Sequence, residues 1–120
     1  MARVLLVGYI PELLLERERT LRSAGYEVTV GPSLATASAA IQQEFFDAAV
    51  LSFSVPEEDR KQLARALKNV QPEAKILMTY FDSLKNTELA DALMPTTASA
   101  EELVRAVNHL LRERKEERTG

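Results

Sequence analysis

The chain has 120 residues and a mass of 13.4 kDa, the size of one domain with a single hydrophobic core. Hydrophobic residues make up 46% of it and charged residues 28%, with four glycines and five prolines, which excludes a disordered or fibrous protein. There is no cysteine, so disulfides, zinc–thiolate sites and thiol catalysis are excluded.

The net charge and the length of the apolar runs limit which partners and which cellular location the protein can have. Fifteen Lys and Arg residues against eighteen Asp and Glu residues give a net charge of −3, without the positive excess that nucleic-acid binding needs. The apolar runs are far shorter than the roughly 20 residues that cross a bilayer, and the N-terminal segment is too short for a signal peptide. We expect a cytoplasmic protein with neither a nucleic-acid nor a membrane partner.

Short apolar runs, each bounded by polar or turn residues, predict buried β-strands. The first run is stopped by Gly8, and its continuous apolar character is typical of a parallel strand covered on both faces. The expected strands are residues 3–7, 27–30, 48–53, 75–79 and 92–94.

Helical periodicity fills most intervals between these strands. Gly25 ends the first helix, and Ser99 with Glu102 forms a capping box that opens the last one. Residues 82–89 give a weaker signal, that of a one- to two-turn helix. The residues that mark the helix starts are Pro11, Ser33, Pro56 and Ser99.

Strands that alternate with helices predict an α/β domain in which helices cover both faces of a parallel sheet. If the strand order is 2-1-3-4-5, it switches between the first and third strands, and functional residues are expected outside the carboxyl ends of the strands. The predicted core faces of the second and third helices are Leu34, Ala37, Ile41 and Phe45, and Leu63, Ala66, Leu67 and Val70.

One part of the chain resembles the third-strand region of response-regulator receiver domains. Residues 46–47 (Phe-Asp) precede an apolar strand, and Ser52, residues 55–56 (Val-Pro) and Asp59 follow it. The similarity extends over essentially the whole chain, and it implies the flavodoxin-like (βα)5 fold with sheet order 2-1-3-4-5.

The resemblance also sets the expected boundaries. The receiver-like domain covers residues 1–112, and residues 113–120 form a charged C-terminal helix extension or tail. The stretch from Thr79 to Pro95 is several residues shorter than in the family, so a shortened or irregular fourth helix is expected.

Receivers take a phosphoryl group from a histidine kinase onto an aspartate after strand three, beside a magnesium ion that an acidic pair helps to hold. A lysine and a hydroxyl contact the phosphoryl oxygens. The resemblance keeps the switch hydroxyl, at Thr79. It places the acidic pair on Gly8 and Tyr9, the phosphoacceptor on Ser52 and the lysine on Pro95 or Thr96.

Without these carboxylates the site has no ligands that suit magnesium, and phosphoryl transfer loses most of its electrostatic stabilisation. The aromatic switch residue of the family maps close to Ala92, which is not aromatic. The sequence therefore resembles a pseudo-receiver that is not an enzyme, holds no metal or cofactor and acts through protein–protein interaction in a two-component-type pathway. The expected partner is a signalling protein, either a histidine kinase or an output protein.

An alternative function is that of a sensing module for a small molecule or an anion. Its site would be formed at the strand ends by Ser52, Thr79, Thr96 and Thr97. Aromatic side chains after the strands would line such a site or would simply fill the space that a magnesium site vacates, which we favour. These aromatic residues are Tyr9, Phe53, Tyr80 and Phe81.

Three single residues carry weaker expectations. Arg17 lies inside the apolar stripe of the first helix, and its stem is expected to pass that stripe and reach water. Leu15 projects opposite to the stripe, and a homodimer would result if Leu14 or Leu15 joined apolar residues of the last helix. His109, the only histidine, is expected to be a solvated helix residue.

Overall fold

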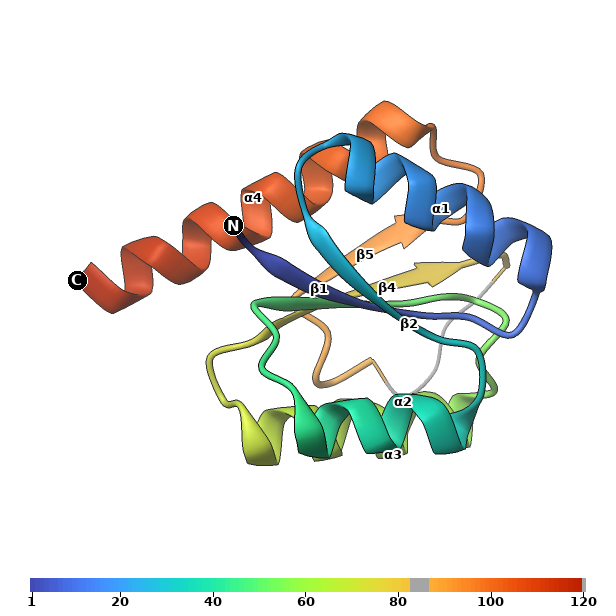
Figure 1. Ribbon diagram of the computed structural model, residues 1–120, viewed down its shortest axis with the longest axis horizontal. Coiled ribbons are helices and arrows are strands. Elements are labelled where there is room, and N and C mark those ends of the chain that lie inside the picture. Colours follow the sequence, from blue (N-terminus) through green and yellow to red (C-terminus); the bar gives the residue numbers. More distant parts are fainter. Residues whose placement is uncertain (83–86, 120) are drawn as a thin grey trace.

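A computed structural model describes residues 1–82 and 87–119 and confirms the predicted fold class. Five parallel strands form one sheet in the order β2-β1-β3-β4-β5, and the described residues contain four helices (Figure 1). The strands are β1 (Arg3–Val7), β2 (Glu27–Gly31), β3 (Ala48–Leu51), β4 (Lys75–Tyr80) and β5 (Ala92–Pro95). The helices are α1 (Pro11–Ser23), α2 (Leu34–Gln43), α3 (Glu57–Val70) and α4 (Ala100–Thr119).

The sheet lies between two layers of helices. Figure 1 shows α1 and α4 on one face of the sheet and α2 and α3 on the other. Successive residues of a strand point to opposite faces, so Leu5 packs in the core under α2 and α3 while Leu6 packs in the core under α1 and α4. Both faces of β1 are therefore buried, as its continuous apolar run predicts.

The predicted helix ends are confirmed where a specific cap defines them. Gly25 follows α1 with a φ of 97°, a backbone conformation that residues with a Cβ rarely adopt. The Ser33 hydroxyl accepts a hydrogen bond from the Thr36 N–H and caps α2. Before α4, Glu102 N–H donates to Ser99 Oγ at 3.1 Å and Ser99 N–H donates to Glu102 Oε1 at 3.3 Å, which is the predicted capping box.

For two residues the predicted burial in the core was wrong. Phe45 is 57% exposed, because α2 ends at Gln43 and the following residues no longer keep the helical period. Phe46 is fully buried in its place. Val70, the last residue of α3, is 46% exposed, and Ala64 is buried on the core face of the helix instead.

Three strands, β2, β4 and β5, end one residue later than expected, and two further elements differ more. β3 ends at Leu51, so Ser52 and Phe53 belong to the loop that follows it. The predicted helix over residues 82–89 lies partly outside the described residues, at 83–86. The described residues 81–82 and 87–91 of the β4–β5 connection form bends, turns and irregular backbone, without a helix.

The last helix continues through most of the charged C-terminal segment. Arg114 lies 8% exposed against the body of the domain, and its Nη1 is 3.0 Å from the Asp47 carboxylate. Its guanidinium carbon lies 5.7 Å from the centre of the Phe45 ring, and Nη2 lies 3.7 Å from the Glu73 carboxylate. In the described part of the chain, no helix is long and apolar enough to span a membrane.

Candidate functional site

The carboxyl ends of the four strands β1, β3, β4 and β5 meet at one edge of the sheet, and the predicted site residues lie there. Ser52 N–H donates to the Val7 carbonyl oxygen at 2.9 Å, which holds the residue after β3 against the end of β1. Thr96 N–H donates to the Tyr80 carbonyl oxygen at 2.6 Å and holds the residue after β5 against the end of β4.

Gly8 and Ser52 lie in direct contact at this edge. A Cβ added to Gly8 would lie 3.1 Å from Ser52 Oγ and 3.4 Å from the Leu14 Cδ1 atom. Ser52 is 2% exposed, so its side chain has little room to move away. The space for a side chain at position 8 is thus already filled by its neighbours.

Tyr9 turns away from the strand ends toward the start of α3. Its N–H donates to Ser54 Oγ at 2.9 Å, and its hydroxyl donates to Asp59 Oδ2 at 3.0 Å. Burial and this hydrogen bond to a carboxylate raise the pKa of Tyr9 from 10.0 to about 12. The phenol stays protonated at neutral pH and fixes the loop after β1 to α3.

The expected environment of the Arg17 side chain on α1 was wrong. Its side chain does not reach water: the residue is 6% exposed, and the guanidinium lies over the ends of β4 and β5. Nη1 donates to Thr79 Oγ1 at 3.4 Å, and Nη2 donates to the Thr96 carbonyl oxygen at 3.0 Å and to Thr96 Oγ1 at 2.9 Å.

The Arg17 charge has no close counter-ion. No carboxylate within residues 1–82 and 87–119 lies at ion-pair distance from it, although the charge of the neighbouring Glu16 acts on it from further away. Burial lowers the pKa of the Arg17 guanidinium from its ordinary value, and Glu16 partly opposes that shift. The edge of the sheet therefore holds a buried cation that neutral oxygens solvate.

Thr79 is the centre of the hydrogen bonds at this edge. It is fully buried, and besides the bond from Arg17 its hydroxyl accepts one from the Phe53 N–H at 3.0 Å. The Phe53 ring lies beside the Phe81 ring, with their centres 6.0 Å apart and their planes at 32°. One hydroxyl thus joins α1, the loop after β3 and the end of β4.

The other predicted residues contribute less to the site. Pro95 and Thr97 are exposed, and only Thr96 faces the Arg17 guanidinium. His109 is exposed and lies 2.8 Å from Glu113 one helical turn on, as expected of a solvated helix residue. Leu15 is 47% exposed, whereas Leu14 is buried and is not available for a dimer patch.

The position of Arg17 in the sequence indicates that its side chain could be buried with polar partners. A charged residue inside an apolar helical stripe either reaches water or finds buried polar partners, and periodicity alone does not separate the two outcomes. The deciding fact is tertiary: the stripe of α1 points at the strand ends where two threonine hydroxyls lie.

The residues at this edge do not fit a magnesium ion. Magnesium prefers carboxylate oxygens, and glycine, tyrosine and serine stand where the resemblance implies carboxylates. The Asp59 carboxylate accepts the hydrogen bond from the Tyr9 hydroxyl. Among the described residues, no group of three or more Asp, Glu or His side chains could hold a metal ion.

Solved structures with the same architecture are response-regulator receiver domains. A CheY-like receiver domain protein from Methanospirillum hungatei has a TM-score of 0.88 and 24% identity, over 98% of each chain. A receiver protein from Sinorhizobium medicae has a TM-score of 0.83 and 25% identity, covering 94% of this chain and 96% of its own.

A third structure carries ligands. The response regulator protein TrrA from Thermotoga maritima, solved with Mg²⁺ and BeF, has a TM-score of 0.80 and 21% identity, covering 92% of this chain and 99% of its own. The chain has the receiver-domain fold. No protein-family model matches the sequence, and no curated protein sequence matches it either.

Proposed function

We propose that this chain is a pseudo-receiver: a signalling domain with the receiver fold that accepts no phosphoryl group after β3 and acts through contacts with a partner protein. The observation that carries the proposal is the Arg17 guanidinium, bonded to Thr79 and Thr96 at the strand ends. By the receiver resemblance, Thr79 would contact the phosphoryl group, and the lysine position falls on Pro95 or Thr96.

The chemistry of the edge supports this proposal. Phosphoryl transfer needs a metal ion or fixed cations placed around the transferred group. The side chains of Gly8 and Ser52 supply no charged oxygen for a metal, and the space beside Gly8 is filled by Ser52 and Leu14. Arg17 supplies a cation, but its Nη1 and Nη2 atoms bond to the oxygens of Thr79 and Thr96.

A domain with this site needs no catalysis to transmit a signal. The receiver fold of the structural neighbours supports a place in a two-component-type pathway. The partner we propose is a signalling protein of such a pathway, either a histidine kinase or an output protein, recognised by the surface of the folded domain.

The test of the proposal is phosphoryl acceptance. The chain is incubated with acetyl phosphate and Mg²⁺ and its intact mass is measured, with TrrA treated in parallel as a control that the reagents work. We expect no mass gain of one phosphoryl group on this chain. A stoichiometric gain that is lost in a Ser52→Ala variant would overturn the proposal.

A second candidate function is the binding of a small oxyanion at the strand ends, and the uncompensated Arg17 charge favours it. A cavity of about 70 Å³ lies next to Arg17, and its other polar lining residues are Glu16, Thr20, Thr96 and Ser99. Guanidinium and hydroxyl donors around a small cavity suit an anion such as phosphate or sulfate.

Thermal unfolding tests this candidate. Anion binding to the folded state raises the melting temperature in proportion to the logarithm of the anion concentration. Phosphate and sulfate should raise it more than chloride at equal ionic strength, and an Arg17→Met variant should lose the difference. Equal effects of all three salts would exclude the oxyanion site.

A further inference from the structure

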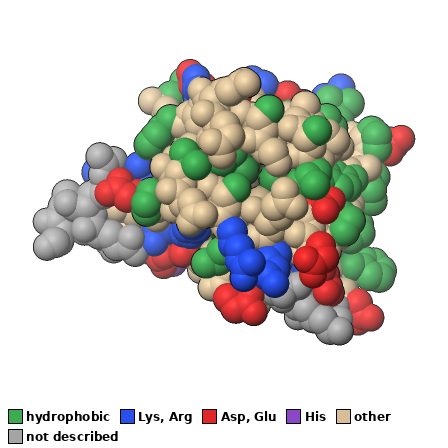
Figure 2. Space-filling model, turned by 90° about the horizontal axis from the view of Figure 1, so that it is seen from below, with side chains coloured by type: hydrophobic (Ala, Val, Ile, Leu, Met, Phe, Trp, Pro, Cys, Tyr) green, Lys and Arg blue, Asp and Glu red, His purple; other side chains and the backbone are tan. Residues whose placement is uncertain are grey.

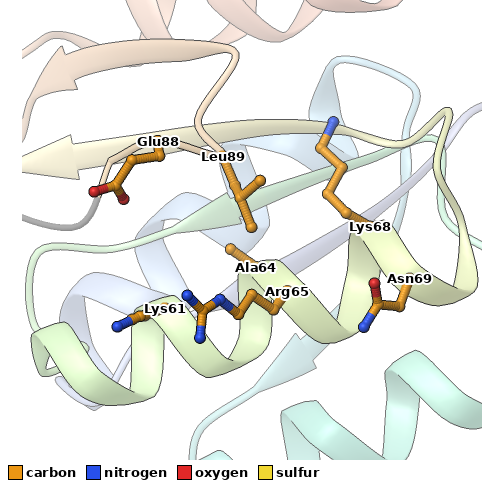
Figure 3. Close-up of a pocket in the computed structure, with 7 residues that line it drawn as sticks. All are labelled: Lys61, Ala64, Arg65, Lys68, Asn69, Glu88 and Leu89. Carbon is orange, nitrogen blue, oxygen red and sulfur yellow. The ribbon is translucent and has the colours of Figure 1, made fainter.

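A groove runs along one flank of α3. Its volume is about 500 Å³, and α3 forms one wall while the connection between β4 and β5 forms the other. Figure 3 shows Leu89 of the connection pointing toward Ala64 of α3 across the groove. The residues that line it are Lys61, Ala64, Arg65, Lys68, Asn69, Glu88 and Leu89.

The groove lies on a flank of α3 that no helix of residues 1–82 and 87–119 covers. Helices on each face of an α/β sheet normally pack beside one another, and α2 covers one flank of α3. On the other flank the described residues 81–82 and 87–91 form no helix. The turn around Leu89 reaches α3 there, and the side chains of α3 beyond it stay open to solvent.

The groove has the opposite charge to the chain as a whole. Three basic side chains and one acidic side chain line it, a net charge of +2, whereas the chain has a net charge of −3. Lys68 is already engaged: its Nζ lies 3.0 Å from the Asp91 carboxylate and donates to the Ala74 carbonyl oxygen at 2.7 Å.

Lys61 and Arg65 are the two cations that remain. They are one helical turn apart, so their side chains lie next to each other along α3. Neither forms an ion pair with a carboxylate within residues 1–82 and 87–119. Figure 2, which looks at the molecule from the side of α2 and α3, shows Lys and Arg side chains gathered on this face beside acidic ones.

We propose that this groove docks an acidic segment of a partner protein. The inference rests on the proposed function, since it names the surface and the kind of partner through which a non-phosphorylated domain would act. Acidic side chains of the segment would pair with Lys61 and Arg65, and an apolar side chain between them would lie over Leu89. The Asn69 amide supplies both a donor and an acceptor for the partner backbone.

Charge complementarity favours an acidic protein segment over a nucleic acid. The two cations Lys61 and Arg65, which pair with no carboxylate in the described part of the chain, face the Glu88 carboxylate and are too few for the phosphate contacts that give nucleic-acid affinity. An apolar surface at Leu89 between the charges suits a peptide with mixed acidic and apolar residues.

The test uses a fluorescein-labelled peptide of 12 residues, made of Glu and Asp with leucine at every fourth position, and measures fluorescence anisotropy. The double variant Lys61→Glu/Arg65→Glu should bind it roughly tenfold more weakly, since two ion pairs become two repulsions. The matched control, Arg19→Glu/Arg105→Glu, makes the same change in net charge at exposed sites on α1 and α4 and should bind within about twofold of wild type.

Three outcomes would overturn the docking proposal. The wild-type chain would not bind the peptide at low salt, or both double variants would lose peptide affinity equally. In the third outcome, the wild-type chain would bind a 12-nucleotide single-stranded RNA more tightly than the peptide, and Lys61→Glu/Arg65→Glu would abolish that binding. None of them bears on phosphoryl acceptance, which the acetyl phosphate experiment measures independently. If the peptide did not bind in the groove and the chain accepted no phosphoryl group, the pseudo-receiver proposal would be retained and only its docking surface would be rejected.

Discussion

Arg17 donates hydrogen bonds from one nitrogen to both oxygens of Thr96, at 3.0 Å to the backbone carbonyl and 2.9 Å to the hydroxyl. Thr96 follows β5, and the receiver resemblance places the lysine of the family on Pro95 or Thr96. A cation from α1 thus lies beside the position at which the resemblance implies a cation. The bonds fix α1, β4 and β5 together at the edge where a receiver would bind its phosphoryl group.

The first prediction concerns the stability that Arg17 provides. Arg17→Ala should lower the free energy of unfolding by about 3 kcal/mol, because it removes three hydrogen bonds, exposes a cavity and leaves buried oxygens of Thr79 and Thr96 without donors. Arg17→Lys should lose less but still lose stability, since one ammonium cannot reproduce the planar fork. Urea unfolding measures both.

The control for this prediction is Arg19→Ala, an exposed arginine on the same helix. It should change the free energy of unfolding by less than about 0.5 kcal/mol. If Arg17→Ala were no more destabilising than Arg19→Ala, the described hydrogen bonds would carry no net stability.

The second prediction concerns the contact between Gly8 and Ser52. A methyl group at position 8 would lie 3.1 Å from Ser52 Oγ and 3.3 Å from Ser52 Cβ, which is closer than side chains normally pack. Gly8→Ala should therefore destabilise the wild-type chain more than it destabilises a Ser52→Gly chain, with a coupling of about 0.5–1 kcal/mol.

A double-mutant cycle in urea measures this coupling. Effects of the lost glycine on the unfolded chain cancel between the two backgrounds, so only the contact remains. Additive changes within about 0.3 kcal/mol would mean that the loop after β1 moves to make room, and that a carboxylate could be accommodated there.

The fold could be predicted from the sequence because local signals agree with each other. The buried strands are short apolar runs in the sequence. The caps at Ser33 and Ser99 mark helix starts by local hydrogen bonds that do not depend on tertiary contacts. The apolar periodicity did not predict where helices end. Phe45 continues the apolar pattern of α2 in the sequence, but the helix ends two residues earlier, and Phe45 lies against Arg114 instead.

The third prediction concerns Arg114, which fixes the last part of α4 to the domain. Its side chain is 10% exposed and pairs with the Asp47 side chain, which is 19% exposed, at 3.0 Å. Arg114→Ala should cost about 2 kcal/mol, because Asp47 would keep a largely buried charge without this partner. Arg105→Ala, an exposed site on the same helix, is the control and should cost less than about 0.5 kcal/mol.

Hydrogen exchange locates the effect of Arg114→Ala. Amides of the last turns of α4 should exchange faster in the variant, and amides of α1 should not. Equal acceleration in both helices would mean that Arg114 acts on the stability of the whole domain rather than on the attachment of α4.

The fourth prediction concerns the proton of Tyr9. Its pKa is raised to about 12 by burial and by the bond to Asp59, so Asp59→Asn should lower it toward 10.0. Carbon NMR of the labelled tyrosine ring measures the titration. Because the folded state has the higher pKa, the stability that Tyr9 contributes is present below about pH 10 and is lost as the pH rises through 12.

A Tyr9→Phe variant separates this contribution from other groups that titrate at high pH. The difference in unfolding free energy between wild type and variant should shrink between pH 10 and 12. A difference that stays constant over that range would mean that the Tyr9 hydroxyl does not keep its bond to Asp59 in solution.

The candidate site could be predicted in part. Gly8, Ser52 and Thr79 lie at the carboxyl ends of strands that the alternation of elements predicts to be parallel, and the strand order follows from the receiver resemblance. The role of Arg17 could not be predicted, because its partners are 62 and 79 residues away in the sequence and meet it only in the folded domain.

The central claim is that the strand ends cannot take up a phosphoryl group with its metal ion. The most direct measurement records amide NMR shifts of the chain on addition of Mg²⁺ and beryllofluoride, with TrrA as the positive control. We predict no saturable shifts at Gly8, Ser52, Thr79 or Thr96. Saturable shifts of these amides, abolished in a Ser52→Ala variant, would contradict the account.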